Sequence, residues 1–267
     1  MNTDALRELE RVEWRVLAAL RPIDAITAAS VVAPLRVTAE GARIARNRSG
    51  LYVIHEWAAL APHAAAFDAP PALPAPGSLA LTVSIVDPAG QYLPRLARIA
   101  LPRDPAAAGE DSLFAARPIA LHPAPGARLG INWCALRVSL AHPASGDALG
   151  GALLRVVAGD AVLARGLSDW RGEALVPVAG IPVTTWSEDE EAVVVSHVAA
   201  TLEAIFDPEA GTRTPITHVR AGRPPPRLPQ VDPDAIESRR ASLPRAQQDV
   251  RLAARAALNL NLGLDLP

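Results

Sequence analysis

The chain has 267 residues, a hydrophobic content of 50% and a mean hydropathy of +0.16, which excludes global disorder and allows one to three domains. All 26 basic residues are arginine, and the net charge of -2 gives no basic field of the kind that general nucleic-acid binding needs. The single cysteine, Cys134, excludes an internal disulfide framework.

The first predicted element is a helix over residues 4–20, within an N-terminal segment 1–22 that Arg21-Pro22 closes. Its apolar residues recur at helical spacing and form one stripe, which we expect to dock on the first β domain or on a neighbouring subunit. No signal peptide and no membrane span is expected, which favours a cytoplasmic protein. The candidate interaction residues of this N-terminal segment are Leu6, Leu9, Trp14 and Leu17.

Residues 31–103 change to strand chemistry and predict a first β-sandwich. β-branched runs and alternating positions indicate strands at 35–38, 51–54, 79–86 and 92–101. Asp87-Pro88-Ala89-Gly90 predicts a β-turn with proline at its second position. Residues 104–130, rich in alanine, proline and glycine, are expected to be a linker.

Residues 131–208 predict a second β-sandwich, because strand and turn signals repeat about every ten residues. Its turns are expected at 143–146, at 159–160 and at 169–172. The predicted strands are 135–141, 152–158, 161–167, 173–178, 191–198 and 201–206.

The last part of the chain predicts a Pro-rich linker, 220–231, followed by a helical tail, 232–267. Asp232 is expected to cap a helix that has Pro233 at its first position, and Pro244 to open a second helix. The apolar residues of this tail leave two alternatives open: docking on another protein, or folding back on the chain's own β domain. The candidate interaction residues of the tail are Leu252, Leu258 and Leu260.

The sequence therefore predicts a mainly β fold: two small antiparallel β-sandwich domains with an N-terminal helix and a helical C-terminal tail. Within residues 135–178, the strand ALRVSLA is followed by a Gly-rich strand entry, by LLRVVAG, and by the turn Asp169-Trp170-Arg171-Gly172. This segment resembles carboxypeptidase regulatory-like, or transthyretin-like, domains, in which a G-x-P-L-x-G-A segment and a D-x-x-G turn each enter a strand. Here Asp147-Ala148 precedes Leu149 and an extra Gly151 precedes Ala152. The resemblance implies a β-sandwich and little about function, since such modules occur in unrelated proteins.

No motif for metal, nucleotide or nucleophilic chemistry is present in the linear sequence. The six histidines lack ligand spacing, and no GxSxG elbow or phosphate-binding glycine loop occurs. The acidic run Glu188–Glu191 has no EF-hand spacing, so it predicts a solvated loop or a docking contact. We therefore expect no cofactor, no metal and no enzyme activity.

Three functions remain open. The first is a non-enzymatic structural or adaptor protein that uses its terminal segments and β edges to join copies of itself or other subunits. Stiff Pro linkers between β modules give it a looser similarity to structural subunits of phage-tail-like contractile particles. The second is a glycan-binding module that uses turn loops and Trp170. The third is an enzyme whose residues converge only in the fold, such as His197 with the acidic run Glu188–Glu191.

Overall fold

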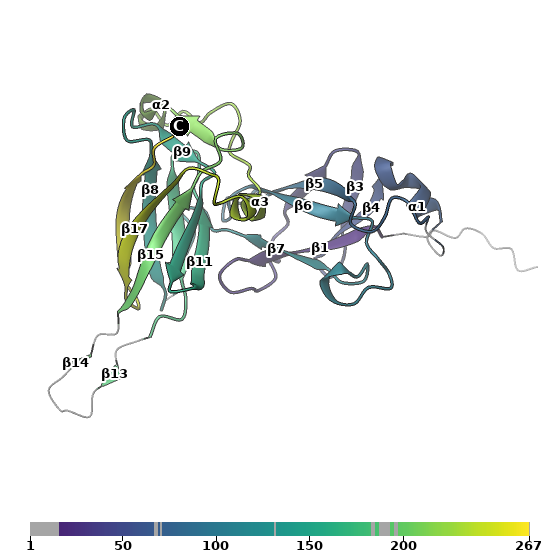
Figure 1. The fold of residues 1–267 in the computed structure, drawn as a ribbon, viewed down its shortest axis with the longest axis horizontal. Helices are drawn as coiled ribbons and strands as arrows, with labels where there is room; N and C mark the ends of the chain where they lie inside the picture. Colours follow the sequence, from purple (N-terminus) through teal and green to yellow (C-terminus); the bar gives the residue numbers. More distant parts are fainter. Residues whose placement is uncertain are drawn as a thin grey trace, which may run out of the picture.

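The computed structural model describes residues 16–66, 69, 71–130, 132–182, 185–186, 193–194 and 197–266. It is mainly β, with several sheets and only short helices. Figure 1 shows two groups of sheets side by side along the longest axis, the N-terminal group in purple, blue and teal and the C-terminal group in teal to yellow. We call them the first and the second unit.

The first unit holds one sheet in the order β3-β4-β1-β7 and another in the order β2-β5-β6. Apolar residues from both sheets form one buried cluster that includes Leu20, Ile54, Ile85 and Ile99. The strands of this unit are β1 (Ala18–Asp24), β2 (Arg36–Ala39), β3 (Ala42–Arg46), β4 (Tyr52–Trp57), β5 (Leu79–Val86), β6 (Arg95–Leu101) and β7 (Arg117–Leu121).

The second unit holds a sheet in the order β11-β10-β15-β17 and a sheet in the order β12-β8-β9-β16, in which β18 also pairs with β8. Its buried cluster includes Leu136, Leu154, Val176 and Leu202. The strands of this unit are β8 (Cys134–Ala141), β9 (Ala148–Gly150), β10 (Leu153–Ala158), β11 (Ala161–Leu167), β12 (Glu173–Val178), β15 (Val198–Ile205), β16 (Thr212–Thr214), β17 (Arg245–Leu252) and β18 (Ala257–Gly263).

The remaining elements are short. A two-stranded ladder joins β13 to β14, and the helical segments connect strands of the larger sheets. These elements are β13 (Thr185–Trp186), β14 (Val193–Val194), η1 (Ala58–Leu60), α1 (Ala61–Ala65), η2 (Gly109–Asp111), α2 (Ile216–Arg220) and α3 (Pro233–Ser238). No helix within the described ranges is long and apolar enough to span a bilayer.

The prediction of an N-terminal helix is wrong over the residues that the structure describes. Residues 1–15 lie outside that part, and residues 18–24 form the strand β1. β1 pairs antiparallel with β4 and parallel with β7, so it lies inside a sheet. Its inward positions are Ala18, Leu20 and Pro22, a spacing of two residues that replaces the helical one.

The residues predicted to be a linker, 104–130, contain β7. This strand pairs in parallel with β1 over five residues, from Leu20 opposite Arg117 to Asp24 opposite Leu121. The first unit therefore extends beyond its predicted range of 31–103, because β1 precedes that range and β7 follows it. The prediction of purely antiparallel sheets is wrong at this position and again where β18 pairs in parallel with β8.

The prediction of a helical C-terminal tail is also wrong, except for one turn and a half. α3 begins at Pro233, and the Asp232 side chain caps it by accepting a hydrogen bond from the Asp234 N–H. After it, residues 245–252 and 257–263 are the strands β17 and β18, which complete the two sheets of the second unit. Alanine favours helix locally, but Leu258, Leu260, Leu262 and Leu264 alternate in period two against the core.

Candidate functional site

The junction between the two units is built around the guanidinium of Arg95, the first residue of β6. Its side chain is 2% exposed. It donates to the Ala120 carbonyl at 2.7 Å and forms ion pairs with Asp234 at 2.9 Å and with Asp232 at 3.4 Å. Because both acids belong to the segment before and within α3, one buried cation of the first unit binds a segment that follows the second unit's β16.

Main-chain N–H groups of β6 reinforce this junction. The Leu96 N–H donates to the Val231 carbonyl at 2.8 Å, and the Arg98 N–H donates to the Asp232 carboxylate at 3.2 Å. Residues 231–232 therefore bind the edge of β6 as a short extra strand would, with a parallel bridge between Arg95 and Val231.

The opposite side of α3 binds the second unit. Glu237 forms ion pairs with Arg155 of β10 at 3.0 Å and with Arg165 of β11 at 3.7 Å. Arg155 also pairs with Glu203 of β15. Ile236 packs in an apolar cluster with Leu153 and other residues of the second unit. Residues 231–238 thus hold both units at once, and we call this segment the clip.

His122, which follows β7, lies buried at the same junction and is 4% exposed. Its backbone carbonyl accepts a hydrogen bond from the Leu93 N–H at 2.9 Å, while its Nδ1 has no hydrogen-bond partner. Burial, and next the positive charge of Arg95, lowers the pKa of His122 to about 4. A hydrogen bond with the Arg165 backbone and the charge of Asp234 raise this pKa but offset only part of the lowering, so the imidazole is neutral near pH 7.

This junction was not predicted from the sequence, although β6 carries a signal for it. In β6 the residues Arg95, Ala97, Ile99 and Leu101 share the inward face of an alternating strand. An arginine at an inward position requires a buried anion, because an unpaired buried charge is very unfavourable. The Asp232-Pro233-Asp234 cap supplies two such anions, but only the fold shows that they reach Arg95.

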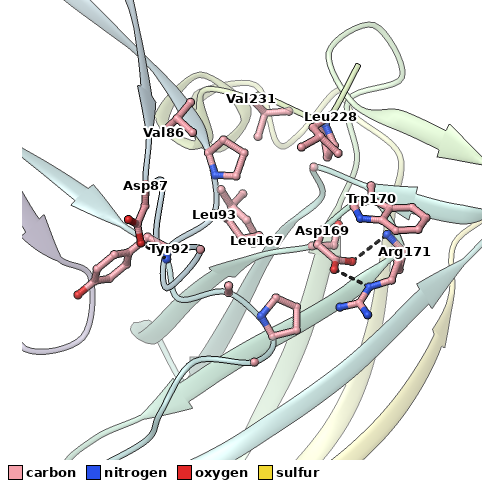
Figure 2. Close-up of a pocket in the computed structure, with 18 residues that line it drawn as sticks. Val86, Asp87, Tyr92, Leu93, Leu167, Asp169, Trp170, Arg171, Leu228 and Val231 are labelled. Carbon is pink, nitrogen blue, oxygen red and sulfur yellow. Dashed lines mark hydrogen bonds and ion pairs between the residues drawn. The ribbon is translucent and has the colours of Figure 1, made fainter. Parts of the chain in front are cut away.

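A cleft of about 370 Å³ opens beside the junction. Figure 2 shows the residues that line it. They come from residues 86–94 of the first unit, from residues 124–126 after β7, from Gly151, from residues 167–171 and from residues 228–231. The carboxylate of Asp87 accepts N–H groups of Ala89, Gln91 and Tyr92 within its own turn. Three prolines, three leucines and two valines contribute apolar side chains to the lining.

Trp170 lines this cleft from the turn Asp169–Glu173, as the predicted turn at 169–172 implied. The Asp169 carboxylate accepts from the Arg171 N–H at 2.8 Å, from Arg171 Nε at 2.9 Å and from the Glu173 N–H at 3.0 Å. The Arg171 guanidinium lies 6.0 Å from the centre of the Trp170 ring. The turn therefore holds a half-buried indole at the rim between the units (Figure 2).

The predicted interaction residues lie in different parts of the chain and differ in burial. Leu6, Leu9 and Trp14 lie outside the described residues. Leu17 is buried in the core of the first unit, and Leu252 is fully buried in the core of the second. Leu258 and Leu260 of β18 are half-buried and pack against that second core. The described tail residues thus serve the chain's own sheets, which was one of the two alternatives.

The acidic run Glu188–Glu191 lies outside the described residues, so its pairing with the exposed His197 stays a hypothesis. Within the described residues, no group of three or more His, Cys, Asp or Glu side chains could hold a metal ion. Cys134 is a buried core residue, and burial raises the pKa of its thiol.

Comparisons with known proteins identify no relative of this chain. A scan against family models, a search of curated proteins and a search of solved structures each find no match. The resemblance of residues 135–178 to carboxypeptidase regulatory-like domains therefore stays a prediction.

Proposed function

We propose that this chain is a non-enzymatic structural or adaptor protein that docks into a larger protein assembly. In this proposal each unit is a β-sandwich, and the two form one rigid body. A phage-tail-like contractile particle is the assembly that we favour, on the analogy of β modules built into such particles.

The observation that supports this proposal is the clip. Two modules that move independently need only a flexible linker between them. Here residues 231–238 bind a buried arginine of the first unit and two arginines of the second. Partner binding is strengthened when the binding surfaces are held in fixed relative positions, because less conformational freedom is lost on docking. A fixed angle between two modules is a property that a scaffold needs.

Docking would use the apolar N-terminal residues Leu6, Leu9 and Trp14 and the open edges of the sheets. Among the residues that the structure describes, the edge strands β3 and β17 each pair with a strand on one side only. An unpaired edge offers a row of N–H and C=O groups to a partner strand.

The test is the mass of the protein in extracts of cells that carry its gene. A tagged chain at native level should sediment well above its own 28.0 kDa. Replacing Leu6, Leu9 and Trp14 together by alanine should lower that mass, because docking would lose its apolar contacts. Leaving those residues intact and changing the exposed Arg48 to alanine is the matched control. Sedimentation of the unchanged chain as a monomer would overturn the proposal.

A second candidate function is glycan binding at Trp170. A polar hollow next to the cleft favours it. A neighbouring hollow of about 350 Å³ shares Arg171, Pro125 and Gly126 with it. The strand registers place Glu173, Ser139 and Asn261 in one row across β12, β8 and β18 on its floor. An aromatic ring beside hydrogen-bonding side chains suits a sugar, which has an apolar ring face and hydroxyl groups.

A glycan array with the purified full chain tests this candidate. Binding should be lost in Trp170→Ala and kept in Trp170→Phe, since phenylalanine still offers a ring face. Equal binding by the alanine variant, or no binding to any glycan by the unchanged chain, would reject it.

A further inference from the structure

β17 is the open edge of the sheet β11-β10-β15-β17 in the second unit. All eight of its residues pair with β15, from Arg245 opposite Ile205 to Leu252 opposite Val198. Its only named strand partner in the described part of the chain is β15. This is a long, regular edge, and such edges are where chains pair with other chains.

The phase of the ladder shows which main-chain groups of β17 face outward. The Phe206 N–H donates to the Pro244 carbonyl at 3.0 Å, which makes Phe206 and Pro244 a hydrogen-bonded pair. In an antiparallel ladder such pairs alternate, so the even-numbered residues of β17 bond to β15. The N–H and C=O groups of the odd-numbered residues therefore point to the open side: Arg245, Gln247, Asp249 and Arg251.

The side chains of these same four residues lie on the exposed face of the sheet, while Val250 and Leu252 face the core. Neighbours on β15 hold two of them in place. The Thr201 hydroxyl donates to the Asp249 carboxylate at 3.0 Å, and the Gln247 amide donates to the Glu203 carboxylate at 2.8 Å. The open edge thus presents a fixed order of charge: positive, neutral, negative, positive.

This order is complementary to itself when two copies of β17 run antiparallel about a two-fold axis at Gln247. Arg245 then lies opposite Asp249 of the second copy, and Asp249 opposite Arg245, while the two Gln247 amides face each other. Each facing pair joins residues whose main-chain groups point outward, so about six main-chain hydrogen bonds form. Opposite charges on facing residues stabilise a strand pair.

Neighbouring registers are less favourable. A shift of the axis to residue 248 places Arg245 opposite Arg251, and a shift to residue 249 places the two Asp249 carboxylates opposite each other. An axis at Val250 again faces Asp249 with Arg251, but its next pair needs Ala253, which lies beyond the end of β17. The charges therefore disfavour the axes at residues 248 and 249, and the length of β17 disfavours the axis at Val250.

We propose that β17 of one copy pairs antiparallel with β17 of a second copy, centred on Gln247, so that two four-stranded sheets become one continuous sheet. This inference rests on the assembly function proposed above and names one of its contacts. Its failure can be told apart from the failure of that function. A chain that is monomeric when pure but sediments as a large complex in extracts would keep the function and lose this contact.

Cysteine cross-linking tests the register directly. Gln247→Cys places two thiols opposite each other at the axis, and the native Cys134 is fully buried. With oxidised glutathione as the oxidant, the full-length variant should give a disulfide-linked dimer on a non-reducing gel. The matched control, Arg251→Cys on the same exposed face, lies away from its own copy and should stay monomeric. No dimer with Gln247→Cys, or equal dimer with both variants, would overturn the proposal.

Charge exchange provides a second test that needs no cross-link. In sedimentation equilibrium the mass of the unchanged chain should rise with concentration toward twice 28.0 kDa. Asp249→Arg should weaken the dimer at least about tenfold, because two repulsive arginine pairs form. The double variant Arg245→Asp with Asp249→Arg restores opposite charges and should restore dimerisation, although it lacks the same Thr201 contact as the single variant. A double variant as weak as the single one would overturn the proposal, and thermal melts confirm that both fold.

Discussion

At the scale of single residues, the turn Asp169–Glu173 depends on one glycine. Gly172 has a φ of +72°, in the left-handed region that favours glycine, and its N–H donates to the Asp169 carbonyl at 2.9 Å. A Cβ at this position would lie 2.2 Å from the Leu140 carbonyl oxygen, which is backbone and cannot move aside. The position of Trp170 at the cleft therefore depends on the absence of a side chain at residue 172.

We predict that Gly172→Ala lowers the free energy of unfolding by about 3 kcal/mol, because it adds both strain and a clash. Gly159→Ala is the matched control, since Gly159 also has a positive φ of +57° but nothing within 4 Å of its Cβ position. That control should cost only about 1 kcal/mol. Urea denaturation of the two variants checks the difference, and equal losses would contradict the role of the Leu140 carbonyl.

At the scale of elements, the strands that the sequence predicted and those that it missed differ in composition. Residues 79–86 and 173–178 were confirmed to the residue, because β-branched and leucine side chains alternate there between turn signals. β1, β17 and β18 were missed because alanine, leucine and arginine dominate them, and these residues favour helix when the neighbours in space are unknown. Tertiary pairing overrode that local preference.

The candidate site was predictable only in part. Trp170 could be placed in a turn, since Asp169 and Gly172 are typical turn residues. The clip could be identified as a capped helix start at Asp232. Neither pattern shows that Arg95 binds Asp232 and Asp234, because the two segments are more than a hundred residues apart and meet only through packing.

We predict that Leu252→Ala lowers the free energy of unfolding by about 3 kcal/mol, since Leu252 is fully buried in β17 and its removal leaves a cavity. A separate helical tail would not give this result. Leu163→Ala in β11, where the side chain is 37% exposed, is the control and should cost less than about 1 kcal/mol. Thermal or urea unfolding measures both, and equal small effects would contradict the integration of β17 in the core.

At the scale of the whole molecule, the clip and His122 make the contact between the units sensitive to pH. The unfolded chain binds a proton at His122 near pH 6.5, whereas the buried imidazole has a pKa of about 4. Between these values the unfolded state holds the additional proton, so the free energy of unfolding decreases as the pH falls. Above about pH 6.5 His122 is neutral in both states, so protonation no longer lowers the free energy of unfolding.

We predict that stability decreases by about 3 kcal/mol between pH 6.5 and pH 4 on account of His122, in addition to other titrating groups. His122→Gln should remove this part of the slope, because glutamine does not titrate. The measurement is urea denaturation of both proteins at half-unit steps of pH. Parallel curves for the two proteins would show that the imidazole is not held neutral at the junction.

The parallel pairing of β18 with β8 has a consequence for synthesis on the ribosome. The edge of β8 that β18 covers is made about 120 residues before its partner, from Ala135 opposite Ala257 onward. The first unit, by contrast, has all its strands by Leu121 and can close early. We therefore expect nascent chains that stall before residue 257 to hold a finished N-terminal module and a C-terminal module with an open seam, the species most prone to bind chaperones or one another.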